Sequence, residues 1–229
     1  MKTLGLIGGM SWESTVPYYR FINEAIKARL GGLHSARLVL YSVDFEQIAR
    51  LQHAGDWDAA GNVLADAAQR LERAGAEALV ICTNTMHKVA PAIEAKVRIP
   101  VLHVVDAVAT EIRAAGFRKV GLLGTRFTME QPFYAQYLAR HGLATLVPEQ
   151  ADRDLVHRVV YEELCLGKIV DASREAYRRI MAKLVTQGAE AIILGCTEIS
   201  MLVGAQDASV PLFDTTAIHA RKAAEWSVA

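Results

Sequence analysis

Two segments of the chain repeat each other almost letter for letter, and they constrain its fold more than any other feature. Residues 75–83 read GAEALVICT and residues 188–197 read GAEAIILGCT. Each is an apolar, strand-like run that ends in Cys-Thr. The second copy holds one extra residue, Gly195, which predicts a β-bulge or a shifted register. Two matched cysteines, Cys82 and Cys196, indicate two similar units with one thiol in each.

Two further pairs of landmarks support an internal duplication. KTLGLIG at 2–8 matches RKVGLLG at 118–124, and IPVL at 99–102 matches VPLF at 210–213. All three pairs occur in the same order in each half of the chain. We therefore predict an N-terminal α/β domain of residues 1–104 plus 215–229, with a returning C-terminal helix, and a second α/β domain of residues 105–214.

Apolar runs that are typical of strands alternate with segments of helical periodicity along the whole chain. Several of these strands are apolar on both faces, which is the signature of parallel sheets covered by helices. The expected fold class is α/β, with two pseudo-symmetric three-layer α/β domains, mostly parallel sheets and an active site in the cleft between them. Strands are predicted at 4–7, 36–43, 79–82, 101–104, 119–123, 144–147, 191–194 and 210–213, the last at an edge because it contains Pro211. Helices are predicted at 13–29, 57–74, 87–96, 106–115, 130–140, 152–166, 171–187 and 216–226.

Composition excludes several functional classes. The 229 residues carry 25 basic and 25 acidic side chains, so there is no electrostatic reason to expect a nucleic acid or a membrane as partner. No run approaches the roughly 20 apolar residues of a membrane-spanning helix, and the apolar N-terminal run is too short for a signal peptide. An odd, low number of cysteines, three, fits free thiols in a reducing compartment. We predict a cytoplasmic protein.

The position of the two repeated cysteines points to chemistry. A single cysteine in an apolar strand usually has only a packing role, but equivalent positions in a repeat favour function. Ligands of parallel sheets bind beyond the carboxyl ends of the strands, where both cysteines fall. A helix that starts there is expected to lower the thiol pKa from about 8.5 toward neutrality and to hold a substrate carboxylate. Cys165 lies in a helix without a partner in the repeat, so we predict that it packs or forms a wall of the site.

Two opposed thiols suit proton transfer better than a disulfide. A disulfide needs sulfurs about 2.05 Å apart. Two thiols that are each about 3–3.5 Å from one carbon would lie on opposite faces of that carbon. One thiol then removes a Cα proton and the other delivers one, which racemises an amino acid without a cofactor. No lysine stands in an obvious site for pyridoxal phosphate. Hydroxyl, amide and backbone N–H groups at the strand ends would stabilise the developing carbanion.

Four motifs resemble the aspartate/glutamate racemase family, and most closely its broad-specificity amino-acid racemases of enteric bacteria. They are GGMSWEST at 8–15, CTNTMH at 82–87, GT at 124–125 and GCTE at 195–198. The resemblance implies a two-domain α/β fold, no cofactor, frequent dimers, and Cys82 and Cys196 as the acid/base pair. It also implies a substrate site lined by Met10, Gln52, Thr83, Asn84 and Thr85. We assign Thr125, Thr197 and Glu198 to the same site.

One departure from the family pattern concerns the substrate. Aspartate-selective relatives tend to carry a lysine in the segment around Cys165, where it meets the side-chain carboxylate of the substrate. This chain reads ELCLGK at 163–168, with Lys168 beyond Gly167. We therefore expect a neutral or broader substrate range rather than a strictly acidic one, and a homodimer that binds a small amino acid.

Other motifs are weaker. The glycines at 5, 8 and 9 do not form the dinucleotide fingerprint, and no acidic ribose ligand follows. The spacing of Cys82 and the histidines does not match a zinc site, so no metal is predicted, and His87 is expected at the surface where a helix starts. Three other functions stay open at this stage. They are a related isomerase or decarboxylase of a small carboxylate, a non-catalytic protein that binds a small acid, and a redox pair formed by Cys82 and Cys196.

Overall fold

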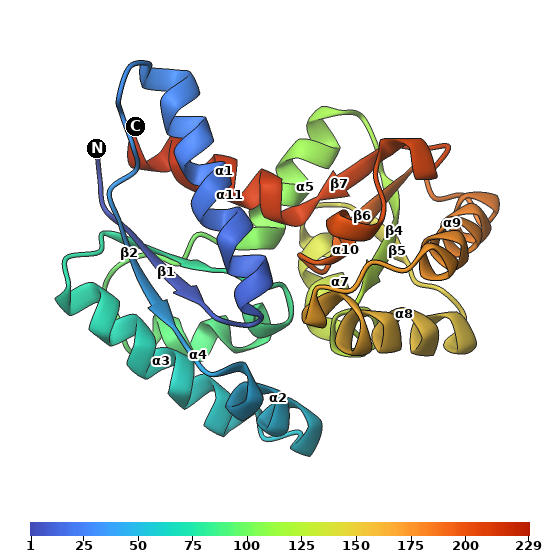
Figure 1. Cartoon of the computed structure of the whole chain (residues 1–229), viewed down its shortest axis with the longest axis horizontal. Helices are drawn as coiled ribbons and strands as arrows, with labels where there is room; N and C mark the ends of the chain where they lie inside the picture. The colour runs from blue at the N-terminus through green and yellow to red at the C-terminus, as the bar shows by residue number, and fades with distance from the viewer. The chain divides into compact units, whose positions relative to one another are not determined.

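The computed structural model describes residues 1–229, and the chain divides into two compact units (Figure 1). The first unit contains Met1–Val104 and His219–Ala229, and the second contains Val105–Ile218. The chain therefore passes from one unit to the other twice. None of the helices combines the length and the apolar character that a membrane crossing requires.

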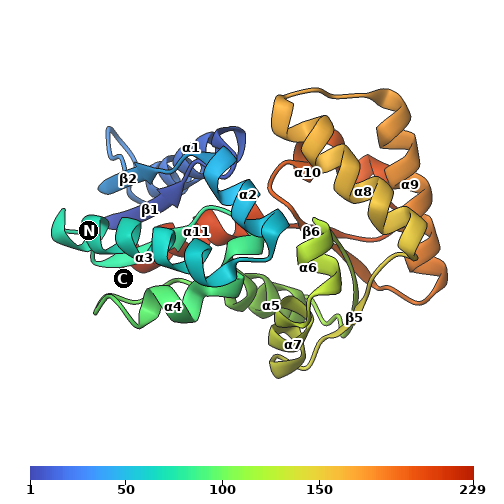
Figure 2. The same cartoon turned by 90° about the horizontal axis from the view of Figure 1, so that it is seen from below.

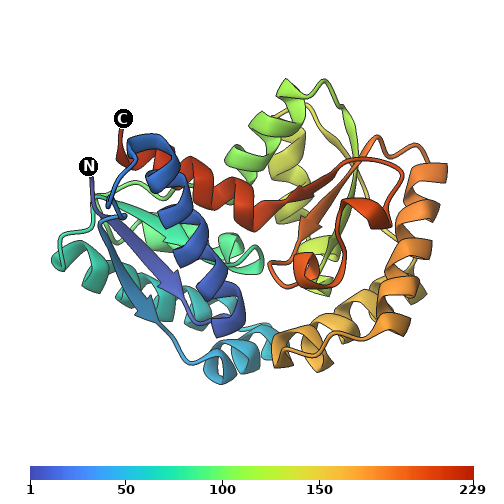
Figure 3. The same cartoon turned by 45° about the horizontal axis from the view of Figure 1, so that its top comes forward.

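Three parallel strands in the order β2-β1-β3 form the sheet of the first unit. Figure 3 shows the two chain termini side by side in this unit, where the N–H of Lys2 donates to the carbonyl of Ser227 at 2.7 Å. Its elements are β1 (Leu4–Gly8), α1 (Trp12–Leu30), β2 (Leu38–Ser42), α2 (Phe45–Ala54), α3 (Trp57–Arg73), β3 (Ala78–Ile81), the 3-10 helix η1 (Thr85–Val89), α4 (Ala90–Glu94) and α11 (Thr215–Ser227), whose first four residues belong to the second unit.

Helices cover both faces of this sheet. Alternate residues of a strand point to opposite faces, and each face of β1 and β3 joins a different apolar cluster. The face packed against α1 and α11 consists of Leu4, Leu6, Ala78 and Val80, with Cys82 just beyond. The face packed against α2, α3 and α4 consists of Ile7, Leu79 and Ile81. The unit is thus a three-layer α/β arrangement.

The second unit repeats this plan with four parallel strands in the order β5-β4-β6-β7. Leu123, Ile192 and Leu194 pack against α8 and α9, and Figure 2 shows α5 and α7 on the other side of the sheet. The elements are α5 (Val104–Ala114), β4 (Lys119–Gly124), α6 (Arg126–Glu130), α7 (Pro132–Arg140), β5 (Ala144–Leu146), α8 (Gln150–Glu162), the 3-10 helix η2 (Leu164–Leu166), α9 (Asp171–Thr186), β6 (Ala191–Gly195), α10 (Ile199–Leu202), the 3-10 helix η3 (Ala205–Asp207) and β7 (Leu212–Asp214). The predicted fold class, two similar α/β units with parallel sheets, is confirmed.

The extra glycine of the second repeat lengthens a strand and does not interrupt it. Ala78 pairs with Leu4 in the first unit, and Ala191 pairs with the matching Val120 in the second. The ladder then runs without a break to the pair Gly124 and Gly195. The expected bulge or register shift is wrong. A Cβ on Gly195 would lie 2.9 Å from the carbonyl oxygen of Leu123, so the close approach of the two strands requires glycine here.

Several predicted elements differ from the observed ones. The strand predicted at 101–104 is only a single β-bridge between Leu79 and Val101, because α5 begins at Val104. The helix α2 was not predicted; Asp44 caps it by accepting from the N–H of Glu46 at 3.2 Å. The helix predicted at 130–140 is α7, which begins at Pro132 because Gln131, the residue before proline, is extended. The short α6 before it was not predicted. The edge position of the 210–213 segment is confirmed by β7.

The helices predicted at 87–96 and 152–166 also divide. The first is the 3-10 helix η1 followed by the short α4. The second ends at Glu162, and η2 follows it as a separate turn. In both cases a 3-10 turn lies near one of the two Cys-Thr turns and interrupts what would be a continuous α-helix.

A buried histidine anchors α11 to the first unit. The Nε2 of His219 donates to the carbonyl of Leu102 at 2.6 Å, and its Nδ1 accepts from the hydroxyl of Tyr18 at 2.9 Å. Both ring nitrogens are therefore used by the neutral imidazole. Burial, with a smaller contribution from the nearby His103, lowers the pKa of His219 to about 4.

This histidine predicts that acid weakens the first unit. Its folded pKa lies below the ordinary value of about 6.5, so its contribution is complete above about pH 6.5 and is lost as the pH falls toward 4. Between about pH 7.5 and pH 5.5 the free energy of unfolding should fall by about 1 kcal/mol through His219 alone. Urea denaturation of the wild type and of His219→Gln at these two pH values measures this. An equal pH dependence in the two proteins would contradict the assignment.

Candidate functional site

Cys82 is the first residue after β3 in the first unit. Its N–H donates to the carbonyl of Ile7 at 2.9 Å, so the pairing of β1 and β3 extends to the cysteine backbone. The side chain is fully buried, and its Sγ lies 3.7 Å from the carbonyl oxygen of Val80. Burial raises the pKa of the Cys82 thiol, because the charged thiolate is poorly solvated there.

His87 holds the segment that follows Cys82. Its Nε2 accepts from the N–H of Val104 at 3.2 Å, which leaves the proton on Nδ1 to donate to the carbonyl of Thr83 at 2.8 Å. The side chain is 2 % exposed, so the expectation of a surface histidine is wrong. Burial lowers the pKa of His87 well below its usual range, and the neighbouring His103 and His219 lower it further. This neutral imidazole ties the Cys-Thr turn to the start of α5.

Two of the predicted substrate residues are linked to Met86, in the segment after Cys82, one by a hydrogen bond and one by a shared apolar cluster. The amide Nε2 of Gln52, on α2, donates to the Sδ of Met86 at 3.0 Å. Met10 belongs to the cluster that includes Met86. Thr83, Asn84 and Thr85 form the turn between β3 and Met86, and Asn84 and Thr85 are buried. The structure thus gathers the residues predicted in the first unit around one turn.

The glycine-rich loop after β1 approaches β2 closely. Gly9 has a φ of 89°, and a Cβ there would lie 2.3 Å from the carbonyl oxygen of Val43. Its N–H donates to the Oγ1 of Thr15 at 2.8 Å, and that hydroxyl donates to the carbonyl of Ser11 at 2.9 Å. These contacts of Gly9 and Thr15 fix the loop that carries Met10.

Cys196 is the first residue after β6 in the second unit, and it faces a carboxylate. Its thiol donates to the Oε2 of Glu198 at 2.9 Å, and the hydroxyl of Thr197 donates to the same oxygen at 2.6 Å. Cys196 is 8 % exposed and Glu198 is 3 % exposed. Burial raises the pKa of the Cys196 thiol, and the negative charge of Glu198 raises it further. Thr197 and Glu198, which the sequence analysis assigns to the site, therefore form one hydrogen-bonded group with Cys196.

The third cysteine also contacts Glu198. The thiol of Cys165, in η2, donates to the Oε1 of Glu198 at 3.7 Å. Burial raises the pKa of the phenols of Tyr161 on α8 and Tyr177 on α9, and each phenol lies near both Cys165 and Cys196. No pattern in the sequence links positions 165 and 198, because the contact arises only when η2 packs beside α10.

The expected effect of helix N-termini on the thiols is wrong. The helices that follow the cysteines are the five-residue η1 and the four-residue α10, and neither has a side-chain cap. The dipole of such short helices is small. Burial dominates instead, and it raises the pKa of Cys82 and Cys196. Both thiols are consequently protonated in the resting protein.

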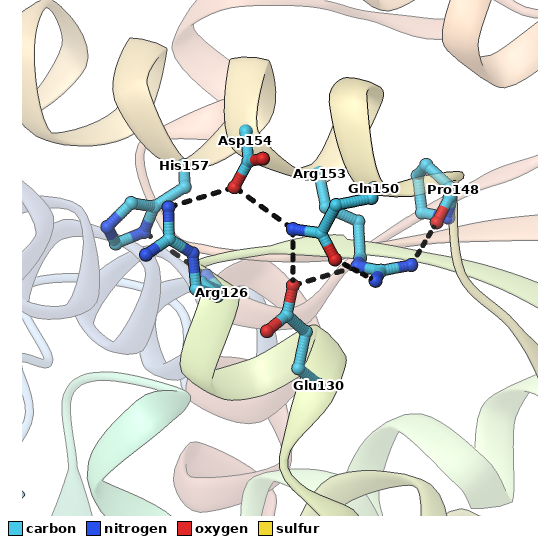
Figure 4. A network of polar contacts seen from close by, with 7 residues as sticks. All are labelled: Arg126, Glu130, Pro148, Gln150, Arg153, Asp154 and His157. Atoms are coloured by element: carbon cyan, nitrogen blue, oxygen red, sulfur yellow. Dashed lines mark hydrogen bonds and ion pairs between the residues drawn. The ribbon is translucent and has the colours of Figure 1, made fainter.

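Thr125 begins α6 at the carboxyl end of β4, and a polar network holds that helix in place (Figure 4). The Oγ1 of Thr125 accepts from the N–H of Thr128 at 3.3 Å. Arg126 bonds Asp154 on α8 at 2.9 Å, and Arg153 bonds Glu130 at 2.9 Å. Partly exposed ion pairs add little stability, but two of them at opposite ends of α6 fix its position on α8 and hence that of Thr125.

Two depressions on the surface are lined by residues other than the cysteines. A depression of about 480 Å³ in the first unit is bordered by Ser42, Asp44 and Asp66. One of about 220 Å³ in the second unit is bordered by Asp152, Arg179 and Lys183. The histidine, cysteine, aspartate and glutamate side chains form no group of three or more that is arranged to hold a metal ion. The two Cys-Thr turns are therefore the best candidates for chemistry.

Several known proteins are similar to this chain. The model of the Asp/Glu/hydantoin racemase family matches residues 7–223. The broad specificity amino-acid racemase RacX of Bacillus subtilis is 21 % identical over 229 residues, which cover 95 % of each chain. A crystal structure of a protein described as an Asp/Glu racemase from Yersinia pestis has 59 % identity and a TM-score of 0.93, with complete coverage of both chains. An aspartate racemase homologue from Pyrococcus horikoshii has 36 % identity and a TM-score of 0.86, also with complete coverage.

The family model spans nearly the whole chain and includes both Cys-Thr turns, the glycine loop after β1 and Thr125. The fold and these motifs agree with the resemblance seen in the sequence. The chain belongs to the Asp/Glu/hydantoin racemase family.

Proposed function

We propose that this protein is an amino-acid racemase that uses Cys82 and Cys196 as its acid/base pair and needs no cofactor. The observation that carries the proposal is that each unit has one of the two thiols directly after a strand of its parallel sheet. Each is the first residue after the strand that pairs with the central strand of its unit, β3 with β1 and β6 with β4. The chain belongs to a racemase family, and racemisation is a reaction that two thiols can catalyse by proton transfer.

The proposed reaction transfers protons at the Cα of the substrate. One cysteine, as thiolate, removes the Cα proton on one face, and the other, as thiol, delivers a proton to the opposite face. The roles exchange with the direction of the reaction. Because both resting thiols have a raised pKa, each needs a local proton acceptor or a cationic substrate before it becomes a base. A thiolate formed in such an apolar environment is poorly solvated and therefore strongly basic.

The remaining residues of the proposed site bind and polarise the substrate. The hydroxyl and amide groups of Thr83, Asn84 and Thr85, with Thr125 and Thr197, are suited to donate hydrogen bonds to the substrate carboxylate and to stabilise the negative charge that develops on it. In this proposal Met10 and Gln52 contact the substrate side chain. Within this proposal the protein is a cytoplasmic homodimer that acts on a small amino acid.

Exchange of the Cα proton tests the two-thiol reaction. In D₂O the wild type should deuterate the Cα of an L-amino acid and form the D-enantiomer. The variants Cys82→Ser and Cys196→Ser should each lose at least about 100-fold in the racemisation rate, since a positioned acid or base contributes that much or more. NMR follows deuteration, and chiral chromatography follows handedness.

The outcomes separate the rival functions. Binding of an amino acid without deuteration would support a binding protein, and deuteration without inversion would oppose racemisation. Full activity in either serine variant would rule out the two-thiol mechanism. A Cys82–Cys196 disulfide that forms under mild oxidation in the wild type would support the redox pair. Far-UV circular dichroism of each variant shows whether the fold is retained.

The charges around Cys196 bear on which amino acid is accepted. The thiol lies against the buried carboxylate of Glu198. The neutral thiol of Cys165 stands in the segment where aspartate-selective relatives tend to carry a lysine, and Lys168 is exposed beyond Gly167. A second carboxylate on the substrate would therefore be repelled, which favours a neutral side chain.

A pair of nearly isosteric substrates tests this preference. L-asparagine and L-aspartate differ mainly in side-chain charge, and so do L-glutamine and L-glutamate. We expect kcat/KM for the neutral member of at least one pair to exceed that of its acidic partner by roughly tenfold, equal to about 1.4 kcal/mol of transition-state binding. A preference for the acidic member in both pairs would contradict the argument.

A further inference from the structure

Glu198 joins two thiols that the sequence keeps far apart. Its Oε2 accepts from Cys196 at 2.9 Å and from Thr197 at 2.6 Å, and its Oε1 accepts from Cys165 at 3.7 Å. The carboxylate is nearly inaccessible, with 3 % of the residue exposed. Both oxygens are thus engaged by donors of the protein itself, a thiol on each side. This arrangement is a continuous path of exchangeable protons.

A two-thiol racemase must reset the protons on its two thiols after each turnover, and this inference rests on the proposed function. After one turnover the thiol that acted as base carries a proton and the other has lost one. The next molecule of the same enantiomer requires the original state, so protons must be exchanged with solvent. Cys196 is 8 % exposed, which leaves its Sγ poorly accessible to water. Proton exchange at Cys196 therefore benefits from a relay through neighbouring groups.

We propose that Glu198 and Cys165 form the relay through which Cys196 exchanges its proton with solvent. Cys165 is the outer end because it is only partly buried and is followed by Leu166, which is 59 % exposed. Glu198 acts through Cys196 as a positioning residue rather than as a substrate ligand. The third cysteine thereby gains a function that neither packing nor the symmetry of the repeat explains.

The proton balance of the relay is simple. When Cys196 is a thiolate, the Cys165 thiol passes its proton to the Oε1 of Glu198 and takes a proton from solvent. The protonated carboxyl group of Glu198 rotates about its Cγ–Cδ bond and then donates this proton to the Sγ of Cys196. The net change is one proton moved from solvent to Cys196. The reverse sequence discharges Cys196 when it must become the base, and no electrons are transferred.

The groups around the relay do not offer an obvious alternative. Tyr161 and Tyr177 face the same cluster from α8 and α9, and burial raises the pKa of both phenols far from neutrality. Glu163, also near Tyr177, accepts from the hydroxyl of Ser173 at 2.7 Å. Glu198 accepts directly from both thiols and from the hydroxyl of Thr197, and of these donors Cys165 is the one on a different segment of the chain.

Steady-state kinetics of position 165 test the relay. At low substrate the enzyme has time to exchange its proton between encounters, whereas at saturation slow exchange limits turnover. Cys165→Ala should therefore lower kcat roughly tenfold, less than the loss of a direct acid or base, while kcat/KM stays within about twofold. Imidazole, a small proton carrier, should restore kcat of this variant. Cys165→Ser should keep most of the wild-type kcat, because a hydroxyl also carries protons.

The serine and alanine variants form the decisive comparison. Both are close in size to cysteine, so a packing role would affect them alike. Leu166→Ala, in the same turn but with an exposed apolar side chain, is the matched control and should leave kcat unchanged. Wild-type kcat in Cys165→Ala, or equal losses in the alanine and serine variants, would overturn the relay alone. A wild type that neither deuterates nor inverts any amino acid would overturn the racemase function, and the relay with it.

Discussion

Parallel pairing of two strands in each unit is the constraint on which the rest of the structure depends. β1 with β3, and β4 with β6, form ladders that start at matching residues and run to the carboxyl edge of each sheet. Buried side chains on both faces fix the register, since a slip by one residue would exchange the two faces. The backbone of Cys82 still donates to Ile7 at the end of its ladder. Each thiol is consequently placed by the core of its unit and not by a flexible loop.

The two thiols share a position along the chain but differ in their surroundings. Cys82 belongs to an apolar cluster with residues of α1 and α11, and a carbonyl oxygen is its nearest acceptor. Cys196 faces a carboxylate that also binds a hydroxyl and a third thiol. Burial raises the pKa of both, but only Cys196 has a negative charge as a further cause. The two strand ends are similar, and the segments that follow them make the surroundings of the two thiols chemically distinct.

Most of the sheets and both candidate thiols were predictable from the sequence because they rest on local patterns. Apolar runs such as residues 78–81 and 191–195 show strand character without knowledge of their neighbours. The contacts that define each site are different, since they join residues far apart in the chain. The sequence predicts a surface position for His87, because its hydrogen bond with the N–H of Val104 is not visible in the local pattern. In the same way, the contact of Cys165 with Glu198 appears only in the folded chain. The helix α2, with Gln52 buried on it, was missed although Asp44 caps it.

The single glycine inserted before Cys196 has a consequence for the chirality of the reaction. Because successive residues of a strand alternate in direction, the insertion turns Cys196 toward α8 and α9, whereas Cys82 lies on the α1 and α11 side of its own sheet. The duplicated halves therefore present their sulfurs from non-equivalent faces. Enantiomers have equal free energies, so the Haldane relation requires the same kcat/KM in both directions whatever the enzyme's asymmetry. The structural difference between the thiols can appear only in how that ratio divides into kcat and KM for each enantiomer.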